Sequence, residues 1–516
     1  MGPWRQSRVK QHRTNPGSAA ILAACFTRYI LLSLLLLNTC AFAAARKPNL
    51  LLIVSEDNGP ELGCYGDPYA QTPTLDRLAS EGVLFENAFV PYSVCSPSRA
   101  CFLTGLYPQQ NGHLGLATHA FTLYKKFATL PGELKAAGYR TGIIGKLHVN
   151  PANAFPFDFK AIPSANFGKR DMKAYAAAAS KFINAGDEPF FLSINYPDAH
   201  FPLLRQQFGL PVTPIEADEV KPLPWVGADS PRLRQFTADY YNCLRRLDDG
   251  VALLLDELAK AGKAENTLIL YIGDHGAQFS RGKTSVYEAG LRIPMIAHWP
   301  GKVKAGERRK ELVSSIDIMP SFISAAGAVV PEGLPGRPLQ PLMRGEAVPW
   351  RDVFCAIATG AAPAIRCMQM SIRDARYKLI YSPMREKNYS AQAYLTQYNP
   401  HFAAGTQEGE ISAAMQGVYD RYLNPPVFEF YDLEKDPYEF HDLANDPAFA
   451  VERERLFKRF RAWQESIKDP FREEANVRFF ADMQAEQAQG AYRKKKHFRW
   501  PYLDVFSRQK PTGRLP

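Results

Sequence analysis

The sequence is poor in cysteine and contains neither internal repeats nor long low-complexity tracts. Only 8 of the 516 residues are cysteine, so the chain is not a small disulfide-dense scaffold. Its content of 46% hydrophobic and 12% aromatic residues excludes a disordered or collagen-like chain. The length allows one large domain with a smaller one, or two to four domains of medium size.

Acidic residues are slightly fewer than basic residues. The chain has 62 Lys and Arg against 52 Asp and Glu, which gives a formal net charge of +10. Five basic residues and no acidic residue precede residue 45, so half of this excess belongs to the first segment. A further basic group, residues 493–499, lies close to the C-terminus. Because the excess is confined to the two ends, we predict no nucleic-acid partner.

The first 43 residues have the three parts of a cleavable export signal. A basic stretch precedes the apolar run 29–37, and Ala-Phe-Ala at 41–43 supplies the small residues of a cleavage site. The apolar run is too short to span a bilayer comfortably. We therefore expect cleavage near Ala43, a periplasmic or secreted protein, and no stable membrane span afterwards. An uncleaved anchor and lipid attachment at Cys40 are the alternatives.

Six cysteines follow the leader. Cys355 and Cys367 are near enough in sequence to pair, but the sequence does not determine disulfide pairing. If one cysteine is consumed chemically, at least one of the remaining thiols is free or bonded elsewhere. The six are Cys64, Cys95, Cys101, Cys243, Cys355 and Cys367.

The next 300 residues alternate short apolar runs with helical patterns. This alternation is typical of an α/β domain with a mostly parallel sheet and helices on both faces. Helical spacing of apolar residues predicts helices at 75–79, 130–137, 172–183 and 236–258. The predicted buried strands are 49–54, 141–145, 189–195 and 267–272.

Beyond about residue 365 the pattern changes. Residues 370–373 and 377–381 predict a hairpin around Asp374-Ala375, followed by a strand at 427–431 and an amphipathic helix at 448–467. These elements predict a small antiparallel α+β domain packed on the large one. The predicted organisation is a leader at 1–43, a large domain at 44–365, and a C-terminal antiparallel sheet and helix subdomain with a basic tail at 366–516.

Each of the four predicted buried strands is followed by charged or imidazole groups. In open α/β sheets the working groups lie just beyond the carboxyl ends of the strands, so we predict that these groups form one site. In chain order they are Glu56-Asp57, Lys146 with His148, Asp198 with His200, and Asp274-His275.

Four of these residues suit a metal. Glu56, Asp57, Asp274 and His275 offer three carboxylates and one imidazole. Such oxygen-rich groups favour a hard divalent cation, Ca²⁺ or Mg²⁺. Taken alone, an acidic pair is more often a solvated loop or a helix cap, but together the strand ends favour a metal.

Residues 92–105 predict an extended segment followed by a helix start. Ser96 is the predicted N-cap, and Pro97 suits the first turn. Cys95 would then lie where helix amides favour an anion, with Arg99 one turn further on. A buried cysteine before a helix and a low-pKa thiolate nucleophile are the alternative interpretations.

The segment 95–105 resembles the signature of the type I sulfatases. Its sequence, Cys-Ser-Pro-Ser-Arg-Ala-Cys-Phe-Leu-Thr-Gly, agrees with Cys-x-Pro-Ser-Arg-x-x-x-Leu-Thr-Gly at every fixed position. The strand-end groups also follow the order found in that family, so the resemblance covers roughly residues 47–470. It implies an alkaline-phosphatase-like sandwich, with the sulfatase catalytic domain at 44–365 and a smaller antiparallel C-terminal domain.

The resemblance also implies a modified cysteine and a metal centre. Cys95 would be oxidised to formylglycine (3-oxoalanine) by a formylglycine-generating or anaerobic sulfatase-maturing enzyme. The hydrated aldehyde is then the nucleophile, and the unmodified thiol is inactive. Glu56, Asp57, Asp274 and His275 match the metal-ligand positions, with residue 95 completing the shell. The family usually has two Asp at the first pair, so Glu56 is a departure.

Further roles follow from the same resemblance. Arg99 would steady the hydrated aldehyde, and Lys146 and Lys283 would bind the sulfate oxygens. His148 would help the covalent sulfate intermediate to collapse, while His200 would protonate the leaving group.

Lys283 lies in the segment 282–294, which resembles the family's Lys…Tyr-Glu-Gly-Gly-x-Arg-x-Pro segment. Within it, Glu288 and Arg292 are predicted to form a structural ion pair rather than to take part in catalysis.

Finer segments resemble the N-sulfoglucosamine sulfohydrolases, the heparan N-sulfatase branch of the family. They are 104–116, 138–149 with 156–159, and the stretch from 431 to 470. There are two departures, since Lys283 stands where that branch has Arg, and His275 replaces its Asn. The resemblance implies hydrolysis of the N-sulfate of non-reducing-end N-sulfoglucosamine in heparin or heparan sulfate. An O-sulfatase acting on another glycosaminoglycan or sulfated polysaccharide is the alternative.

Two rivals of other classes are weaker. A phosphatase or phosphonate hydrolase of the same superfold generally uses Thr or Ser as nucleophile, which the signature at Cys95 opposes. A non-catalytic glycan-binding relative would not need complete metal, Lys and His positions. We expect the tail at 492–500 to be solvated, with contact to acidic glycan as the alternative, and a homodimer is one assembly left open.

Overall fold

The structure is a computed structural model that describes residues 46–163, 167–384, 387–396 and 404–507, with residues 1, 2, 4, 6 and 8. Contacts divide the chain into Met1–Lys47 and one compact unit, Pro48–Pro516. The predicted export signal at 1–43 lies almost wholly outside the described residues. Among the residues that are described, no helix combines the length and the apolar character needed to cross a membrane.

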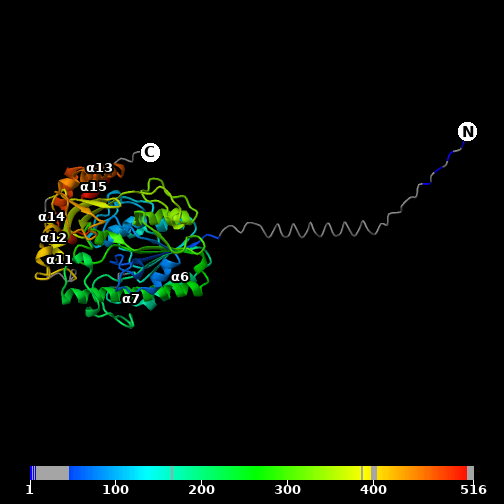
Figure 1. The fold of residues 1–516 in the computed structure, drawn as a ribbon, viewed down its shortest axis with the longest axis horizontal. Helices are drawn as coiled ribbons and strands as arrows, with labels where there is room; N and C mark the ends of the chain where they lie inside the picture. Colours follow the sequence, from blue (N-terminus) through cyan, green and yellow to red (C-terminus); the bar gives the residue numbers. More distant parts are fainter. Residues whose placement is uncertain are drawn as a thin grey trace. The chain divides into compact units, whose positions relative to one another are not determined.

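A large sheet forms the centre of the compact unit (Figure 1). Its pairings are parallel except those of β9 with β2 and β7. This confirms the predicted mostly parallel sheet, and the four predicted strands are its neighbours β7, β1, β6 and β4. In sheet order the eight described strands are β10 (Glu307–Arg309), β2 (Val83–Phe85), β9 (Met295–His298), β7 (Thr267–Gly273), β1 (Asn49–Ser55), β6 (Phe190–Asn195), β4 (Arg140–Gly145) and β5 (Phe159–Ala161).

The central strand β1 is apolar along its length because both of its faces are covered. Leu50, Leu52 and Val54 belong to one hydrophobic core. Leu51 and Ile53 belong to the core on the other face. A strand buried on two faces carries a continuous apolar run instead of an alternating pattern, which is what the sequence has here.

Helices supply the other half of each core. One face is covered by α2 (Pro73–Ser80), α6 (Met172–Ile183) and α7 (Pro231–Lys260), and α6 and α7 can be followed along one side of the sheet in Figure 1. The other face is covered by α3 (Cys95–Thr104), α5 (Leu130–Ala136) and α9 (Ile318–Ala325).

The predicted helices are confirmed, although α7 begins before the predicted start at 236. Ser230 caps its N-terminus by accepting a hydrogen bond from the backbone N–H of Leu233, and Pro231 suits the first turn. Short elements complete this part of the chain: α4 (Pro108–Asn111), α8 (Glu288–Leu291), α10 (Gln340–Met343) and a small sheet of β11 (Val313–Ser314), β3 (Ala88–Phe89) and β8 (Arg292–Ile293).

The C-terminal part contains an antiparallel sheet, as predicted. Its hairpin turns at Asp374, whose carboxylate accepts hydrogen bonds from the backbone of Arg376 and Tyr377 at 2.9 and 2.8 Å. The strands are β12 (Phe354–Gly360), β13 (Arg366–Arg373), β14 (Tyr377–Tyr381) and β15 (Phe428–Asp432). The helices are α11 (Tyr389–Tyr394), α12 (Ala413–Leu423), α13 (Ala450–Ser466), α14 (Glu474–Glu486) and α15 (Tyr502–Ser507).

The two sheets share a hydrophobic core. Ala356 of β12 and Ile380 of β14 belong to the same core cluster as Leu50 of the large sheet. The antiparallel sheet begins at β12, ahead of residue 366, and the predicted boundary at 365 stays a prediction. Cys355 and Cys367 lie on β12 and β13 as free thiols.

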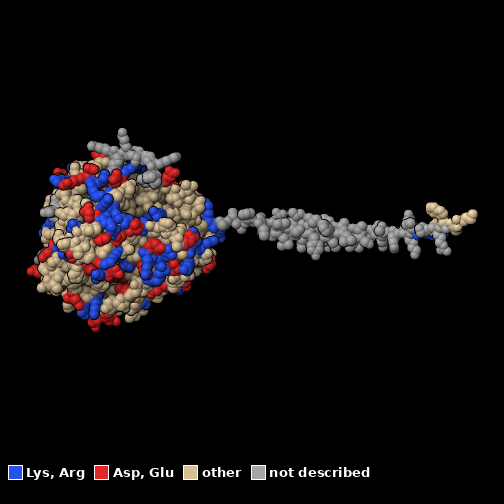
Figure 2. Space-filling view, turned by 45° about the horizontal axis from the view of Figure 1, so that its top comes forward, with Lys and Arg blue, Asp and Glu red and all other residues tan. Residues whose placement is uncertain are grey.

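On the face shown in Figure 2, Lys and Arg side chains are interspersed with Asp and Glu.

Candidate active site

The carboxyl ends of four adjacent strands bring the predicted residues together. Glu56 and Asp57 follow β1, and Asp274 and His275 follow its neighbour β7. On the other side of β1, His200 lies beyond β6, and Lys146 and His148 lie beyond β4. Parallel strands have their carboxyl ends at one edge of the sheet, so residues up to 219 positions apart in sequence meet there. This is where working groups are expected in an open α/β sheet.

Cys95 is the first residue of α3. Val94 is the N-cap, so the prediction of Ser96 as the cap is wrong: the Ser96 hydroxyl instead accepts a hydrogen bond from the backbone N–H of Ala117 at 2.9 Å. The Cys95 side chain is buried, and its Sγ lies 3.4 Å from His275 Nε2. A group at this position faces the positive end of the helix dipole.

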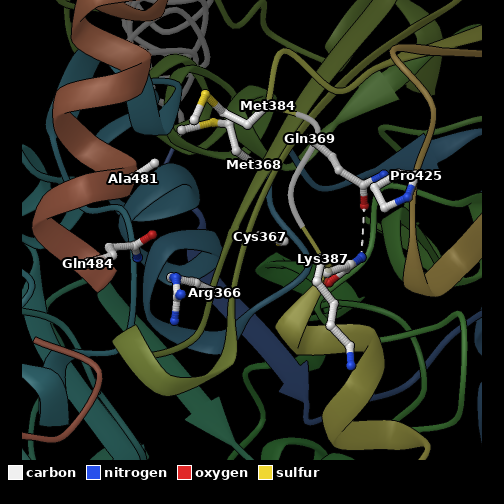
Figure 3. Close-up of a pocket in the computed structure, with 10 residues that line it drawn as sticks. Arg366, Cys367, Met368, Gln369, Met384, Lys387, Pro425, Ala481 and Gln484 are labelled. Carbon is white, nitrogen blue, oxygen red and sulfur yellow. Dashed lines mark hydrogen bonds between the residues drawn. The ribbon is translucent and has the colours of Figure 1, made fainter. Parts of the chain in front are cut away.

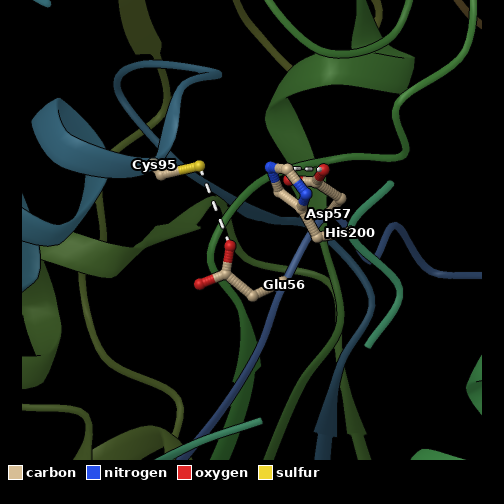
Figure 4. A group of neighbouring side chains, drawn as sticks. All are labelled: Glu56, Asp57, Cys95 and His200. Atoms are coloured by element: carbon tan, nitrogen blue, oxygen red, sulfur yellow. Dashed lines mark hydrogen bonds and ion pairs between the residues drawn. The ribbon is translucent and has the colours of Figure 1, made fainter. Parts of the chain in front are cut away.

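The candidate metal donors form two groups that share Cys95. Side-chain donor atoms of Glu56, Asp57, Cys95 and His200 all lie within 4.8 Å of one another, as do those of Cys95, Asp274 and His275. Figure 4 shows the Cys95 sulfur directed at Glu56, with Asp57 and His200 side by side. All five predicted metal ligands belong to these groups. Three carboxylates within one small volume are a donor set that fits a hard divalent cation.

Two lysines neutralise carboxylates of this site. Lys146 Nζ lies 2.7 Å from Glu56 Oε2, and Lys283 Nζ lies 2.9 Å from Asp57 Oδ2. Both lysine side chains are almost fully buried. Their proximity to the carboxylates compensates much of the cost of burying charge.

Arg99 joins four strand ends. Its Nη2 contacts Glu56 and lies 3.2 Å from Asp274 Oδ2. Its Nη1 donates to the carbonyl of Lys146 at 3.0 Å and to Asn195 Oδ1 at 2.7 Å. The sequence did not single out Asn195, although a polar residue that ends an apolar strand was a signal for it.

The backbone is unusual at three positions of this edge. Asp57 and His148 have φ values of 48° and 53°, a region that non-glycine residues rarely adopt. At Gly145 φ is 86°, and a Cβ there would lie 2.2 Å from the carbonyl oxygen of Asn195, so glycine is required immediately before Lys146. Such conformations gather where function demands a particular side-chain position.

The cations around Cys95 favour its anionic form. Burial by itself raises the pKa of the thiol, but Lys146, Lys283 and His275 outweigh burial and lower the pKa well below its ordinary value. The environment of residue 95 therefore stabilises negative charge on its side chain.

The carboxylates make the same site attractive to a cation. Burial and then Asp274 raise the pKa of Glu56 to about 7. Burial opposes the charge on His275, but Asp274 and Asp57 raise the pKa of this imidazole to about 9. The carboxylates thus hold a proton on His275, and a divalent cation would compete with that proton for the same negative field.

Two histidines face the same space. His200 Nδ1 donates to the carbonyl of Phe201 at 2.7 Å, which leaves Nε2, 3.8 Å from Asp57 Oδ2, as the nitrogen on the site side. The ring of Phe167 stacks on His200 with centroids 3.7 Å apart and an interplanar angle of 2°. Burial lowers the pKa values of both His148 and His200. The sequence had not indicated Phe167.

A family model described as Sulfatase matches residues 48–328, which include every site residue described above. The chain belongs to the sulfatase family. A second family model, described as N-sulphoglucosamine sulphohydrolase, C-terminal, matches residues 273–401. This sulfatase is therefore a sulfuric ester hydrolase, as the signature predicted.

Individual relatives agree with the family. Human N-sulphoglucosamine sulphohydrolase is 32% identical over 480 residues, which cover 85% of this sulfatase and 93% of the relative. An ulvan-active sulfatase of Formosa agariphila is 29% identical over 437 residues, which cover 83% and 82% of the two chains. A solved structure described as a complex with its substrate D-glucosamine-2-N,6-O-disulfate has a TM-score of 0.64 at 20% identity, covering 82% and 99%. This structural likeness confirms the predicted fold class.

Asp198 is not among the candidate metal donors. It lies in a second buried cluster, which we call the Asp198 cluster, with Arg170 and Arg246. Arg246 donates to both carboxylate oxygens, at 2.8 and 2.7 Å. Arg170 contacts the same carboxylate and donates to the carbonyls of His200 and Pro202, each at 2.6 Å. The cluster therefore fixes the backbone that carries His200.

The predicted ion pair of Glu288 and Arg292 is wrong. The Glu288 carboxylate instead contacts Arg373 and lies 3.0 Å from Lys378 Nζ, both on the antiparallel sheet. Arg292 donates to the backbone carbonyl of Glu86. Glu288 therefore ties the large sheet to the C-terminal one, a contact between segments that sequence spacing does not reveal.

Two cavities of this sulfatase differ greatly in size. One, between β13 and α14, is lined by Arg366 and Gln484 among others, and its volume of about 20 Å³ has room for roughly one water molecule (Figure 3). The other has a volume of about 1,080 Å³ and is lined by Cys95 and by the four catalytic candidates Lys146, His148, His200 and Lys283. Only the second is large enough for a sugar.

Proposed function

We propose that this sulfatase removes a sulfate group from a sulfated glycan, with residue 95 acting as formylglycine. The observation that carries the proposal is the position of Cys95, which begins a helix, lies among carboxylates and cations, and lines the large cavity. A nucleophile in such a place is stabilised as an anion and remains accessible to a substrate.

We assign a divalent cation to the same site. Glu56, Asp57, Asp274 and His275 would hold it together with residue 95. We favour Ca²⁺ because five protein donors suit a larger ion of high coordination number, whereas Mg²⁺ usually keeps several waters. A cation bound there supplies Lewis acidity, which polarises sulfate oxygens and makes a bound hydroxyl more acidic.

The lysines of the site bind the sulfate. Lys146 and Lys283 both line the cavity, so a sulfate that enters it offers their ammonium groups new oxygen partners. A lysine can make this exchange because its three donors rotate on a flexible stem. Two cations beside the sulfate oxygens stabilise the charge that develops as the bond from sulfur to oxygen or nitrogen breaks.

The histidines move protons. His200 would deliver a proton from Nε2 to the leaving oxygen or nitrogen when its ring is doubly protonated, since Nδ1 keeps its own proton in the hydrogen bond to the carbonyl of Phe201. One hydroxyl of the hydrated side chain of residue 95 would attack sulfur as the glycan leaves, which gives a sulfated side chain. His148 would then remove the proton of the remaining hydroxyl, so that the bond from carbon to the sulfate oxygen breaks, sulfate departs and the aldehyde forms again. Arg99, held by Glu56 and Asn195, would steady that side chain.

Within sulfated glycans, we propose the N-sulfate of a non-reducing-end N-sulfoglucosamine in heparin or heparan sulfate. The match of residues 273–401 to the C-terminal model of N-sulphoglucosamine sulphohydrolase supports this choice, as does the similarity over nearly the whole human relative. The alternative is an O-sulfate of another glycosaminoglycan or polysaccharide, which the similarity to an ulvan-active sulfatase favours.

The proposal also covers the localisation of the protein, its maturation partner and its assembly. The leader at 1–43 supports export to the periplasm or the medium, and residue 95 requires a formylglycine-generating or anaerobic sulfatase-maturing enzyme as a partner. A homodimer is one assembly consistent with the proposal.

The test is sulfate release from a disaccharide with non-reducing-end N-sulfoglucosamine, beside an O-sulfated disaccharide. The protein is co-produced with the modifying enzyme, and mass spectrometry verifies formylglycine at residue 95. Release from the N-sulfated substrate alone is the expected result. Release from the O-sulfated substrate alone would move the specificity to the alternative, and hydrolysis of phosphonate or phosphate esters without sulfate release would overturn the proposal.

Two variants control this experiment. Cys95→Ala removes the modified residue and is expected to abolish release. Cys101→Ala changes another buried cysteine of the same helix, one outside the candidate site, and is expected to keep activity within about twofold.

A further inference from the structure

The C-terminal segment of the chain contributes to the wall of the large cavity. Arg493, more than 200 residues beyond the last strand-end group, is one of the residues that line it. Trp500 and Tyr502 anchor the segment: Trp500 stacks on Phe121 with ring centroids 4.8 Å apart, and the Tyr502 hydroxyl donates to the carbonyl of Gly112 at 2.7 Å. Both side chains are buried, so the position of the segment is set by packing.

Contacts with its neighbours hold the Arg493 guanidinium in place. Its Nε donates to the Tyr492 hydroxyl at 3.2 Å, and its Nη2 lies 3.1 Å from His119 Nδ1, which Tyr492 also contacts. Trp500 Nε1 donates to the carbonyl of His119 at 3.0 Å. His119 lines the cavity as well. The arginine is therefore oriented by an aromatic and an imidazole, and neither of them neutralises its charge.

His119 is suited to this role as a neutral acceptor. Burial, and then the charges of Arg493 and His148, lower its pKa to about 4. A neutral ring that accepts at Nδ1 carries its proton at Nε2, and the Tyr492 hydroxyl and Arg493 Nη2 share the single lone pair of Nδ1.

Arg493 and the lysines at the reacting end differ in whether a carboxylate lies beside the cation. Lys146 and Lys283 each have a carboxylate within 3.0 Å. Within the described part of the chain, no carboxylate lies within 4.0 Å of Arg493, and none lies within that distance of Lys160, another cation on the cavity wall. Beyond the sulfate site, the cavity therefore has positive charge that no protein carboxylate neutralises. This favours a ligand that carries a negatively charged group.

We propose that Arg493 binds a second anionic group of the glycan, a carboxylate or a sulfate other than the one that is hydrolysed. A guanidinium presents a planar set of donors that matches either group in a bidentate fashion. The inference rests on the proposed function and makes Arg493 a specificity-determining residue of the same site. It also revises the expectation that the basic tail is only solvated surface.

The test compares Arg493→Gln with Lys494→Gln, an exposed neighbour that does not line the cavity. The substrates are N-sulfoglucosamine, which has a single anionic group, its 6-O-sulfated form, and a disaccharide in which N-sulfoglucosamine precedes a uronic acid. For a substrate with a second anionic group, Arg493→Gln is expected to raise KM about tenfold and to leave kcat within about twofold. N-sulfoglucosamine itself and the Lys494→Gln variant should show KM changes below about twofold, and added salt should shrink the difference.

The pattern across substrates identifies the anionic group. A KM increase for the disaccharide alone assigns Arg493 to a carboxylate, an increase for the disulfated sugar alone assigns it to a sulfate, and an increase for both assigns it to either group. Equal KM changes for all three substrates, or none, would overturn the inference.

A binding measurement separates this inference from the proposed function. Calorimetry with Cys95→Ala, which cannot turn over, compares affinity for the disaccharide with and without Arg493→Gln. A roughly tenfold loss of affinity supports the inference even if the wild type releases no sulfate from these sugars. Identical affinities, or no binding of any of the three sugars, would overturn it whatever the activity shows.

Discussion

Two buried charge clusters lie at the same edge of the large sheet, and they use different cations. In the first, Lys146 and Lys283 each contact one carboxylate and also line the cavity. In the Asp198 cluster two arginines surround one carboxylate, all three side chains have 0% exposure, and none of them lines the cavity. One cluster is open to a ligand and the other is closed.

The choice of cation follows from this difference. Lysine presents a compact charge with rotatable donors, so it can leave a carboxylate for a sulfate oxygen. Arginine presents a rigid fork, and Arg246 uses it to bind both oxygens of Asp198. The closed cluster is thereby suited to fixing the chain near His200, and the open cluster to exchanging partners during a reaction.

The largest effect is expected at the open cluster. Lys283→Met removes the cation beside Asp57 and should lower kcat for sulfate release by about 10²- to 10³-fold, because one charge-stabilising donor is lost. Lys283→Arg keeps the charge, and its kcat should stay within about tenfold of wild type. Steady-state kinetics of the two variants measure these changes in kcat. Equal losses of kcat in both would contradict the role of Lys283 as an exchangeable charge.

Metal removal should affect the open cluster alone. Exhaustive dialysis against a chelator is expected to reduce sulfate release by about 100-fold and to lower Tm, because a ligand of the folded state is lost. Added Ca²⁺ should restore both, and Mg²⁺ should restore less. Calorimetry of Cys95→Ala with Ca²⁺ provides a readout independent of turnover, and unchanged Tm values after dialysis and after adding back the metal would argue against the site.

Breaking the closed cluster should have a smaller, indirect effect. Arg170→Met removes the donors to the carbonyls of His200 and Pro202, and we expect kcat to fall about tenfold with little change in KM. Arg170→Lys should recover only part of the loss, since one ammonium cannot replace the fork. Arg234→Met, which removes an exposed ion pair with Asp229, is the matched control and should change neither kcat nor Tm appreciably. A loss of Tm without a loss of kcat would show that the cluster only stabilises the fold.

A third buried cluster, centred on the carboxylate of Glu429, gives the smallest expected effect. Glu429 accepts hydrogen bonds from the hydroxyls of Tyr287 and Tyr431, and Arg421 lies 3.8 Å away. Burial raises its pKa from 4.5 to about 7. Because the folded value is the higher one, its contribution to stability is fully present below about pH 4.5 and is lost as pH rises through 7, a change of about 3 kcal/mol.

Glu429→Gln imitates the protonated carboxyl and should remove this pH dependence. Relative to wild type, the variant is expected to gain about 3 °C in Tm between pH 4.5 and 8, since a chain of this size loses about 1 kcal/mol per degree near Tm. Thermal unfolding of both proteins across that range tests whether the Tm of the variant rises relative to that of the wild type as pH increases. A difference in Tm that stays constant with pH would contradict the raised pKa.

Much of the fold and the site was predictable from local sequence. The continuous apolar run of β1 predicted a strand buried on both faces, and the polar groups after four strands predicted the edge where the site lies. The resemblance of residues 95–105 to the sulfatase signature predicted the family that the comparison confirms. The roles of the individual site residues stay predictions.

Other features were not predictable, because they depend on contacts between distant segments. Phe167 comes from a chemically ordinary position and acquires its importance only beside His200. The sequence predicted a structural ion pair between Glu288 and Arg292, but the packed antiparallel sheet offers Glu288 the side chains of Arg373 and Lys378 instead.

By itself, the sequence determined the strands, most helices, the sulfatase signature and the residues that end the strands, because these depend on local patterns of apolar and polar side chains. Tertiary structure decided which charges meet. It separated Asp198 from the candidate metal donors and placed Arg493, from the C-terminal segment, in the wall of the cavity. The physical reason is that Coulomb and hydrogen-bond energies depend on distance in space, and the packing of the two sheets sets those distances.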